Sequence, residues 1–511
     1  MKKAFYFLCF SLTFLMFCTT AQAGEGFYQT IAPQKSKQTE VKGIRLKTQA
    51  EVGSVLRMEI AANGSFVVEG IEFVEQKEVL GEVHNYYKVL QKDIFIGGDI
   101  TSLYCNYWEL ESVDTSQAPS LKEFNCHDNQ SVSLDFSHNT QLKKLVCSLC
   151  DLETLDLSQN TQLEYLDCSE NKLTSLNLDN HKKLQILSFQ RNKISTFNLS
   201  DLTALREFYS DYNLLTSIDC SKNLQLQVLK CNANKLTALD LTNNKELKEL
   251  QCDQNEIKNF SLNSTSLIEF YISNCKTESL SIIAPNLDLF VCYGNLLTSL
   301  DLSKCPLLNA LSCHTNKLKT LDLSTSPNLE YIWCNNNQLE TLDFSANPRV
   351  FSVTCYGNSL QDKEMDKLIE TLPTRIKDDM ATLILIDTQD ESEKNQCTVA
   401  SVNKAKEKSW SVYDYDGGKT PYPGIPYEGK DTANEIIQKD AISIYPNPTT
   451  DYLFLRNNTD NPTEAKLFAE DGRLLLSVRV VSLIEKIDLR SFKVGTYILR
   501  VGDQSRVILK R

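Results

Sequence analysis

The chain has 511 residues, with 66 acidic and 53 basic side chains and a formal net charge of −13 at pH 7. An acidic chain repels phosphate backbones and anionic lipid, so we exclude nucleic acid as a partner. The length allows several domains.

The N-terminus has the three parts of a secretory signal peptide. Lys2 and Lys3 supply the positive start, residues 4–18 form an apolar run too short to span a bilayer, and Ala21-Gln22-Ala23 supplies the small residues of a cleavage site. We therefore predict a signal peptide over residues 1–23, with a membrane anchor as the alternative. Cleavage removes two lysines and takes the net charge of a soluble mature chain from −13 to −15.

Residues 24–98 are rich in β-forming runs and predict a β cap ahead of a repeat array. The runs are at residues 55–60, 66–73, 86–90 and 94–96. Asn63-Gly64, between the first two runs, predicts a hairpin. A repeat array needs such a cap because its end coil would otherwise expose the core to water.

Residues 99–360 consist of about thirteen copies of a 21-residue repeat. In the copy whose first position is Leu163, Leu166 and Cys168 are two residues apart, so in a strand both point inward while Asp167 points out. Leucines at positions 11, 14 and 16 of the copy return along the opposite wall. One coil cannot bury these side chains alone, so the coils are expected to stack into a solenoid with one continuous core.

The ninth position of the coil is most often asparagine. The chain must turn there, and an inward amide can bond backbone groups that have no strand partner. Trp108, Cys150 and Cys275 replace it in three coils, which we expect to turn less rigidly. The predicted structural asparagine ladder consists of Asn129, Asn171, Asn192, Asn213, Asn234, Asn255, Asn295, Asn316, Asn337 and Asn358.

The sixth position is most often cysteine, and the predicted ladder is Cys105, Cys126, Cys147, Cys168, Cys231, Cys252, Cys292, Cys313, Cys334 and Cys355. Phe189 and Ile272 take the same position elsewhere, which indicates an apolar slot, and Ser210 takes it once. We expect buried free thiols, because side chains in register point in parallel and keep successive Cβ atoms too far apart for a disulfide. Cys147 and Cys150 match a C-x-x-C motif only as positions six and nine of one coil. Cys305 and Cys397 fall outside the ladder and receive no role.

This repeat, L-x-x-L-x-C-x-x-N-x-L-x-x-L-D-L-S, resembles bacterial leucine-rich repeats of the internalin type, and most of all the internalin J type with its cysteine ladder. The β-rich segment before it resembles the small β-domain that precedes such repeats in Bacteroidota proteins. The resemblance covers about 260 residues. It implies an extracellular role in adhesion or recognition, and it does not name a ligand.

Beyond the repeats, residues 361–417 predict an α/β cap of two βα-type units. Residues 363–372 and 402–408 read as helices, and residues 381–386 and 410–413 read as strands. Asp414-Tyr-Asp416-Gly417 is interpreted as a turn, because a calcium-binding EF-hand loop is absent. Residues 418–440 are rich in proline and glycine and predict a linker, in which Asp431-Thr432-Ala433 weakly resembles an O-glycosylation signal.

Residues 441–511 predict a separate small β-sandwich, with a hairpin at Asp471-Gly472. The sequence resembles the sorting domain of type IX secretion cargo at Tyr445-Pro-Asn-Pro448-Thr, Asp451-Tyr-Leu453, residues 495–501 and the basic end Lys510-Arg511. The resemblance implies passage across an outer membrane, removal of the domain and attachment of the remainder to surface lipopolysaccharide. An ordinary C-terminal sandwich is the alternative.

Outward residues on the strand side are free of packing rules, so a ligand can select their chemistry. Exposed aromatic rings there are typical of recognition surfaces, although they could also only stabilise the sheet. An acidic strip beside them is expected to steer a basic partner; it consists of Glu207, Asp211, Glu249, Asp253 and Glu269. The candidate ligand-binding residues are Tyr209, Tyr212, Tyr271, Tyr293, Tyr331, Trp333 and Tyr356, with Tyr104, Tyr107 and Tyr165 on the same side.

We interpret the chain as a secreted or outer-membrane surface protein, exported through the periplasm, that binds a protein or glycan on a host or neighbouring cell. A structural surface or biofilm component that associates with itself or with polysaccharide is the alternative. Recognised nucleophile, zinc-protease and phosphate-loop motifs are missing. We therefore expect no catalytic residue, no metal and no cofactor, and a secretion-machinery contact through residues 441–511.

Overall fold

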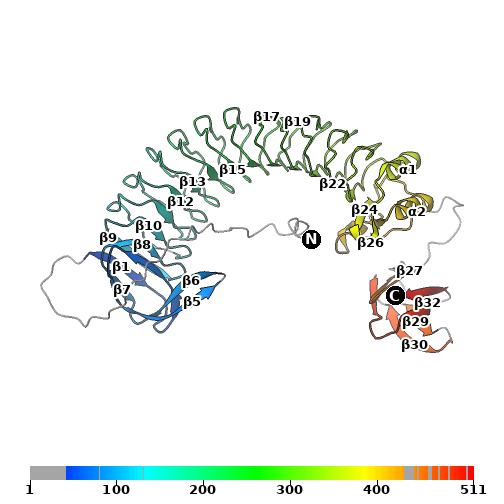
Figure 1. Ribbon diagram of the computed structural model, residues 1–511, viewed down its shortest axis with the longest axis horizontal. Coiled ribbons are helices and arrows are strands. Elements are labelled where there is room, and N and C mark those ends of the chain that lie inside the picture. The colour runs from blue at the N-terminus through cyan, green and yellow to red at the C-terminus, as the bar shows by residue number, and fades with distance from the viewer. Residues whose placement is uncertain are drawn as a thin grey trace.

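The computed structural model describes residues 42–430 and 442–511, apart from residues 80, 131, 446–447, 458–462, 470–471, 481–483 and 502–503. The predicted signal peptide, residues 1–23, and residues 431–440 of the predicted linker lie outside the described residues. The middle of the chain is a curved solenoid with its strands on the inner side of the arc (Figure 1). None of the described helices is long and apolar enough to cross a membrane.

The N-terminal cap is built from two antiparallel sheets that share one core with the repeats. The first sheet has the order β4 (Val67–Glu69), β7 (Asp93–Gly97), β1 (Gly43–Thr48) and β9 (Leu110–Gln117). The second has the order β2 (Val55–Arg57), β6 (Glu82–Val89) and β5 (Ile71–Val79). Because β9 is the return segment of the first coil, its pairing with β1 joins cap and solenoid.

The predicted hairpin around Asn63-Gly64 is wrong. The strand before it, β3 (Glu59–Ala62), pairs antiparallel with the first solenoid strand, β8 (Ile100–Tyr104), and β4 after it pairs with β7. The two strands separate because the open edge of the solenoid sheet needs a backbone partner, and β3 supplies it. The hairpin of this domain is instead formed by β5 and β6.

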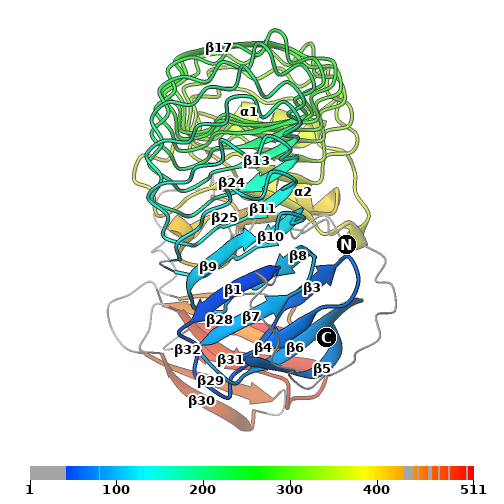
Figure 2. The ribbon, with the colours of Figure 1, turned by 90° about the vertical axis from the view of Figure 1, so that its left-hand side faces the viewer.

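Thirteen parallel strands, and hence twelve turns, form the inner sheet of the solenoid among the described residues. Each strand is three residues long after β8, with its middle residue buried and in register with the next, as Leu145, Leu166 and Leu187 are. Figure 2 shows the first strands of this sheet side by side. The thirteen strands of the inner sheet are β8, β10 (Glu123–Asn125), β11 (Lys144–Val146), β12 (Tyr165–Asp167), β13 (Ile186–Ser188), β14 (Glu207–Tyr209), β15 (Val228–Lys230), β16 (Glu249–Gln251), β18 (Glu269–Tyr271), β20 (Leu289–Val291), β21 (Ala310–Ser312), β22 (Tyr331–Trp333) and β23 (Ser352–Thr354).

Two coils are one residue shorter than the rest, and their outer walls differ. The copies that begin at Leu247 and Leu267 have 20 residues. Their return segments straighten into strands β17 (Asn259–Asn263) and β19 (Ser279–Ile283), which pair in parallel on the convex side. Removing one residue therefore replaces an irregular wall with a short second sheet.

The asparagine at position nine bonds two coils together. In Asn171 the side-chain amide donates to the carbonyls of Cys147, 2.9 Å away in the preceding coil, and Cys168, 3.0 Å away in its own. Its oxygen accepts from the backbone N–H groups of Cys150 and Leu152 in the preceding coil, at 3.1 and 2.9 Å. The amide thus satisfies buried groups that the three-residue strands cannot reach.

The residue before each of these asparagines adopts a left-handed backbone conformation, for example Glu170 with φ 53° and Arg191 with φ 53°. In the three coils without the asparagine, the residue after position nine is left-handed as well: Glu109, Asp151 and Lys276 have φ of 48°, 57° and 58°. These coils therefore turn differently. That they also turn less rigidly stays a prediction.

The predicted cysteine ladder is confirmed as a column of buried free thiols. The thiol of Cys168 donates to the carbonyl of Ser188 in the next coil over 3.6 Å, and Cys231 does the same to Gln251 over 3.5 Å. Ser210 in the same slot donates to the carbonyl of Lys230 over 3.2 Å. The slot is therefore apolar in its walls and has one carbonyl acceptor, which explains why serine is accepted once.

A second ladder runs along the convex side and was missed in the sequence. Its members are Asn139, Asn160, Asn223, Asn244 and Asn347, three residues before the first position of the next coil, and each amide donates to two carbonyls of the preceding coil. The buried His181 takes the same position and lies 3.2 Å from the carbonyl of Leu157 through Nε2. Cys305, which received no role from the sequence, is a buried substitute in this ladder.

The C-terminal cap contains the two helices and two strands that were predicted, and its strands continue the inner sheet. It contains α1 (Asp362–Thr371), the 3-10 helix η1 (Lys377–Asp379), β24 (Ala381–Ile386), α2 (Val399–Glu407), β25 (Trp410–Asp414), the 3-10 helix η2 (Asp416–Gly418) and β26 (Ile425–Pro426). Strands β24 and β25 extend the parallel sheet, and α1 contacts α2 beside it. Cys397 is buried in this cap.

The predicted linker of residues 418–440 begins too early. Strand β26 pairs antiparallel with β25, Tyr427 donates its backbone N–H to Val412 over 3.0 Å, and Lys430 donates to Cys397 over 2.8 Å. The proline- and glycine-rich composition makes a turn that covers the last edge of the sheet, so the cap extends to Lys430.

The C-terminal domain is a pair of antiparallel sheets, as predicted. One has the order β27 (Ile442–Tyr445), β28 (Tyr452–Asn457) and β31 (Ile484–Asp488); the other has the order β30 (Leu474–Val480), β29 (Thr463–Ala469), β32 (Gly495–Val501) and β33 (Gln504–Lys510). Leu453, Leu467, Ile487 and Leu499 lie in their shared core.

Replacing Asn244 with alanine should lower the free energy of unfolding by about 2–4 kcal/mol, because two buried carbonyls lose their donor. The adjacent Asn243 is exposed and makes one 3.4 Å hydrogen bond. Asn243→Ala should therefore change stability by less than about 0.5 kcal/mol. Urea unfolding followed by circular dichroism compares the two variants, and equal effects would contradict the second ladder.

All fifteen described cysteines should resist a thiol reagent in the folded protein and react after unfolding. They are buried, and burial raises the pKa of thiols such as Cys313 to about 12, so the reactive thiolate is scarce. Mass spectrometry of the native protein checks the oxidation state. Several disulfides between successive ladder cysteines would overturn the free-thiol ladder.

Candidate binding surface

The concave face of the solenoid is formed by side chains on either side of each buried strand residue. The strands line the inner side of the arc (Figure 1). Positions three and five of each coil point away from the core and position seven follows at the turn, so the residues at these positions form three columns along that side. No packing rule fixes these columns, and their chemistry changes along the sheet.

The predicted aromatic residues lie on this face with different exposure. Tyr212 is 45% exposed, whereas Tyr356 is 8% exposed because it stacks on Tyr415 of the cap, with ring centroids 4.4 Å apart. Tyr356 therefore packs against the cap and offers little exposed area to a ligand. The half-buried residues are Tyr209, Tyr271, Tyr293, Tyr331 and Trp333.

One end of the concave face carries a group of rings, which we call the aromatic end and define as Tyr331, Trp333 and Tyr422. The rings of Tyr331 and Trp333 are parallel within 4°, with centroids 5.9 Å apart. Tyr422, 57% exposed, comes from the cap turn, and its hydroxyl lies 3.3 Å from the hydroxyl of Ser352. The sequence did not indicate Tyr422, because the fold-back of the cap brings it there from a segment interpreted as linker.

The middle of the concave face is acidic, as the sequence predicted for Glu207, Asp211, Glu249, Asp253 and Glu269. We call these five the acidic centre. Tyrosine hydroxyls hold two of them, Tyr209 donating to Glu207 over 2.7 Å and Tyr271 to Glu269 over 3.1 Å. Lys230 pairs with Glu249 at 2.8 Å.

The aspartates of the acidic centre accept backbone hydrogen bonds, a structural role that an uncharged acceptor could also fill. Asp211 accepts the backbone N–H of Asn232 over 2.8 Å, and Asn232 in turn accepts that of Asp253 over 2.8 Å. Burial raises the pKa of both Asp211 and Asp253 to about 6. A neutral amide in the coil between them thus makes the same bond without the cost of a buried charge.

Replacing Asp211 with asparagine should stabilise the protein at neutral pH by roughly 2–3 kcal/mol, from a shift of about two pKa units at 1.36 kcal/mol each. The folded pKa is raised above its ordinary value of 3.8. The native state therefore holds the proton more tightly, and wild-type stability falls as pH rises from about 4 to about 6.

Urea unfolding across this pH range measures the effect. With Asp211→Asn the free energy of unfolding should decrease less as the pH rises, and with the reverse variant Asn232→Asp it should decrease more. No gain from Asp211→Asn at neutral pH, together with no loss from Asn232→Asp, would contradict the buried-charge argument.

A histidine, a serine and an aspartate meet near the start of the concave face, but in the wrong order for nucleophilic catalysis. His127 lies 2.8 Å from the hydroxyl of Ser148 through Nδ1, and the Ser148 hydroxyl helps to lower the pKa of Asp167, which burial raises. In a catalytic triad the histidine stands between the other two. Here the serine does, so Asp167 does not orient the histidine, and the Ser148 side chain is itself buried away from a substrate.

Metal and thiol chemistry find little support in the part of the chain that the structure describes. It contains no group of three or more histidine, cysteine, aspartate or glutamate residues that could hold a metal ion. The two cysteines of the C-x-x-C motif, Cys147 and Cys150, are both free, and the sulfur of Cys150 lies 3.8 Å from that of Cys126 in the preceding coil.

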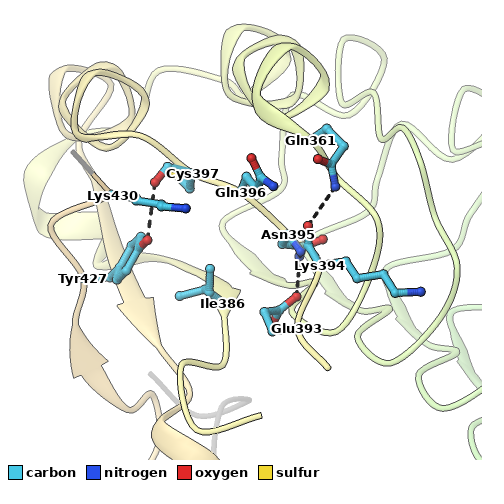
Figure 3. A pocket seen from close by; sticks show the side chains of 9 residues that line it. All are labelled: Gln361, Ile386, Glu393, Lys394, Asn395, Gln396, Cys397, Tyr427 and Lys430. Atoms are coloured by element: carbon cyan, nitrogen blue, oxygen red, sulfur yellow. Dashed lines mark hydrogen bonds between the residues drawn. The ribbon is translucent and has the colours of Figure 1, made fainter. Parts of the chain in front are cut away.

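A cavity of about 360 Å³ lies within the C-terminal cap, lined by residues between Gln361 and Lys430 (Figure 3). Its polar groups serve the fold: Glu393 accepts the backbone N–H groups of Gly357, Asp387 and Asn395, each over 2.9 Å. Gln361 donates to the carbonyl of Lys394 over 2.9 Å. We therefore interpret this cavity as structural.

The C-terminal domain matches a known family. Residues 443–511 fit the model described as the secretion system C-terminal sorting domain.

The chain is an exported leucine-rich-repeat solenoid with a type IX sorting domain.

The sorting domain indicates delivery to the cell surface or the medium and a contact with the secretion machinery. No curated protein matches the chain significantly.

Several solved leucine-rich-repeat structures are similar at low identity. The functional domain of InlJ from Listeria monocytogenes, which includes a cysteine ladder, is 20% identical over 83% of this chain and 94% of that chain, with a TM-score of 0.41. A leucine-rich-repeat protein of Leptospira interrogans is 21% identical over 58% and 79%, with a TM-score of 0.46. The effector YopM from Yersinia pestis is 22% identical over 57% and 87%, with a TM-score of 0.43. These likenesses are too distant to transfer a function.

Deleting residues 442–511 should leave the protein in the periplasm, because the sorting domain directs the chain to the machinery that carries it across the outer membrane. Cell fractionation with an antibody to the repeats measures the distribution. A truncated chain that still reached the surface or the medium would contradict the assignment of that role.

Proposed function

We propose that this protein is a non-catalytic recognition protein of the cell surface, which binds a protein or glycan ligand through the concave face of its solenoid. The observation that carries the proposal is the contrast between Asn232 and its neighbours Asp211 and Asp253. All three occupy position seven and accept a backbone N–H from the next coil, that of Ser273 in the case of Asp253, yet the two aspartates carry buried charges that oppose folding. Residues that cost stability are expected where a ligand uses them.

The aromatic end supports the same proposal from different chemistry. Trp333 and Tyr422 are large, partly exposed rings that the solenoid does not require for its core. Tryptophan and tyrosine dominate the energetics of recognition surfaces because they offer wide contact area at small conformational entropy cost. The geometry at His127, Ser148 and Asp167 gives no support to a hydrolytic role.

A binding experiment with the mature protein separates recognition from a structural role. Pull-downs use host surface proteins in one arm and bacterial surface material in the other. Alanine at Tyr331 and Trp333, or asparagine at Asp211 and Asp253, should weaken capture at least about tenfold.

The matched control is Asn243→Ala on the convex side, which should leave capture unchanged. Self-association that is insensitive to every concave-face variant would contradict the proposal and favour the structural alternative.

A further inference from the structure

The aromatic end belongs to a stretch of the concave face that carries no charged side chain at positions three, five and seven. Burial and the nearby Glu330, at position two, raise the pKa of Tyr331. In the four coils of β20, β21, β22 and β23, the residues at positions three, five and seven are Leu289, Val291, Tyr293, Ala310, Ser312, His314, Tyr331, Trp333, Asn335, Ser352, Thr354 and Tyr356. His314 is neutral as well, because burial lowers its pKa to about 4, and it stacks on Tyr293 with centroids 4.5 Å apart. The preceding four coils, β14 to β18, carry the acidic centre on the same columns.

The rings at this end have small neighbours on both sides. Tyr331 is in register with Ala310 and Ser352, and Trp333 with Ser312 and Thr354. These four small residues are buried, so the exposed apolar surface of the face lies in the rings and little of it is aliphatic. We call this pair of parallel rings the ledge. Beside it, Phe351 packs edge-on against Tyr331, with ring centroids 4.7 Å apart.

The cap adds a third ring to the ledge. The Tyr422 hydroxyl meets Ser352, the register neighbour of Tyr331, so Tyr422 and Tyr331 lie beside the same residue. The ledge thus combines strand β22 with the turn that leads to β26, which lie together at one end of the arc (Figure 1). Four strands at about 4.8 Å spacing make the uncharged stretch roughly 14 Å long.

Resting on the function proposed above, we propose that the aromatic end binds a neutral glycan, with sugar rings stacked on Trp333, Tyr331 and Tyr422. The face of an aromatic ring is electron-rich and attracts the polarised C–H groups on the flat side of a sugar ring. A neutral glycan has no charge to leave unpaired on this uncharged surface. An anionic glycan is disfavoured, since the chain carries a net charge of −13 and the acidic centre lies in the adjacent coils.

The test uses the mature protein on an array of neutral, anionic and amino-sugar oligosaccharides, followed by calorimetry with the best neutral oligosaccharide. Neutral oligosaccharides should bind, and their affinity should stay within about twofold between about 0.05 and 0.5 M salt, because no ion pair is involved. Trp333→Ala and Tyr422→Ala should each weaken binding about tenfold or more. Trp333→Phe, which keeps a ring, should weaken it less than Trp333→Ala.

The matched control is Tyr165→Ala, a half-buried aromatic residue at the same position as Tyr331 but in a coil that also carries Asp167. This variant should bind the neutral oligosaccharide with unchanged affinity. Thermal melting detects whether a change at Trp333 disturbs the fold. If it does, Tyr422→Ala still tests the proposal, because Tyr422 lies on the surface of the cap turn.

Binding of anionic glycans alone, of proteins alone, or of neutral glycans with affinity unchanged by the aromatic variants would overturn the glycan assignment. A protein partner whose binding depends on Asp211 and Asp253 would leave the proposed recognition function intact while removing this inference. If no concave-face variant weakened either glycan binding or protein binding, both the glycan assignment and the proposed recognition function would be overturned.

Discussion

The structure depends on one constraint: a coil of 21 residues can satisfy neither its apolar nor its polar groups without the next coil. The leucines of one coil are covered by their counterparts above and below, and Asn171 bonds the backbone of the preceding coil as well as its own. The convex ladder also links successive coils, since Asn244 donates to the carbonyls of Cys220 and Asn223 in the preceding coil. Stability therefore resides in contacts between neighbours, as in a one-dimensional array.

This division leaves the concave columns free to vary. Cap and core residues hold the strands in place, so positions three, five and seven change from an acidic centre to an uncharged aromatic end within the length of one sheet. Asn232 shows that the backbone needs only an acceptor at position seven, and the aspartates beside it add a charge. The same solenoid thus presents two chemically different surfaces side by side.

The sequence predicted the solenoid well because its period fixes which residues point inward. It predicted the column of Cys168 and the inward Asn171, but it missed the convex ladder, where His181 and Cys305 interrupt the asparagines. The hairpin at Asn63-Gly64 failed because turn chemistry is local, whereas β3 is recruited by a distant sheet edge. Tyr422 was missed for the same reason, since its place depends on how the cap folds back onto β25.

Hydrogen exchange of the folded mature protein tests the dependence of each coil on the next most directly. Leu173, Ile194 and Leu215 donate their backbone N–H groups to an asparagine side chain of the next coil, at 2.9, 3.0 and 2.9 Å. These turn amides should be as strongly protected as the strands beside them. Exchange at the rate of exposed loops, in coil after coil, would contradict a solenoid held together by its amide ladder.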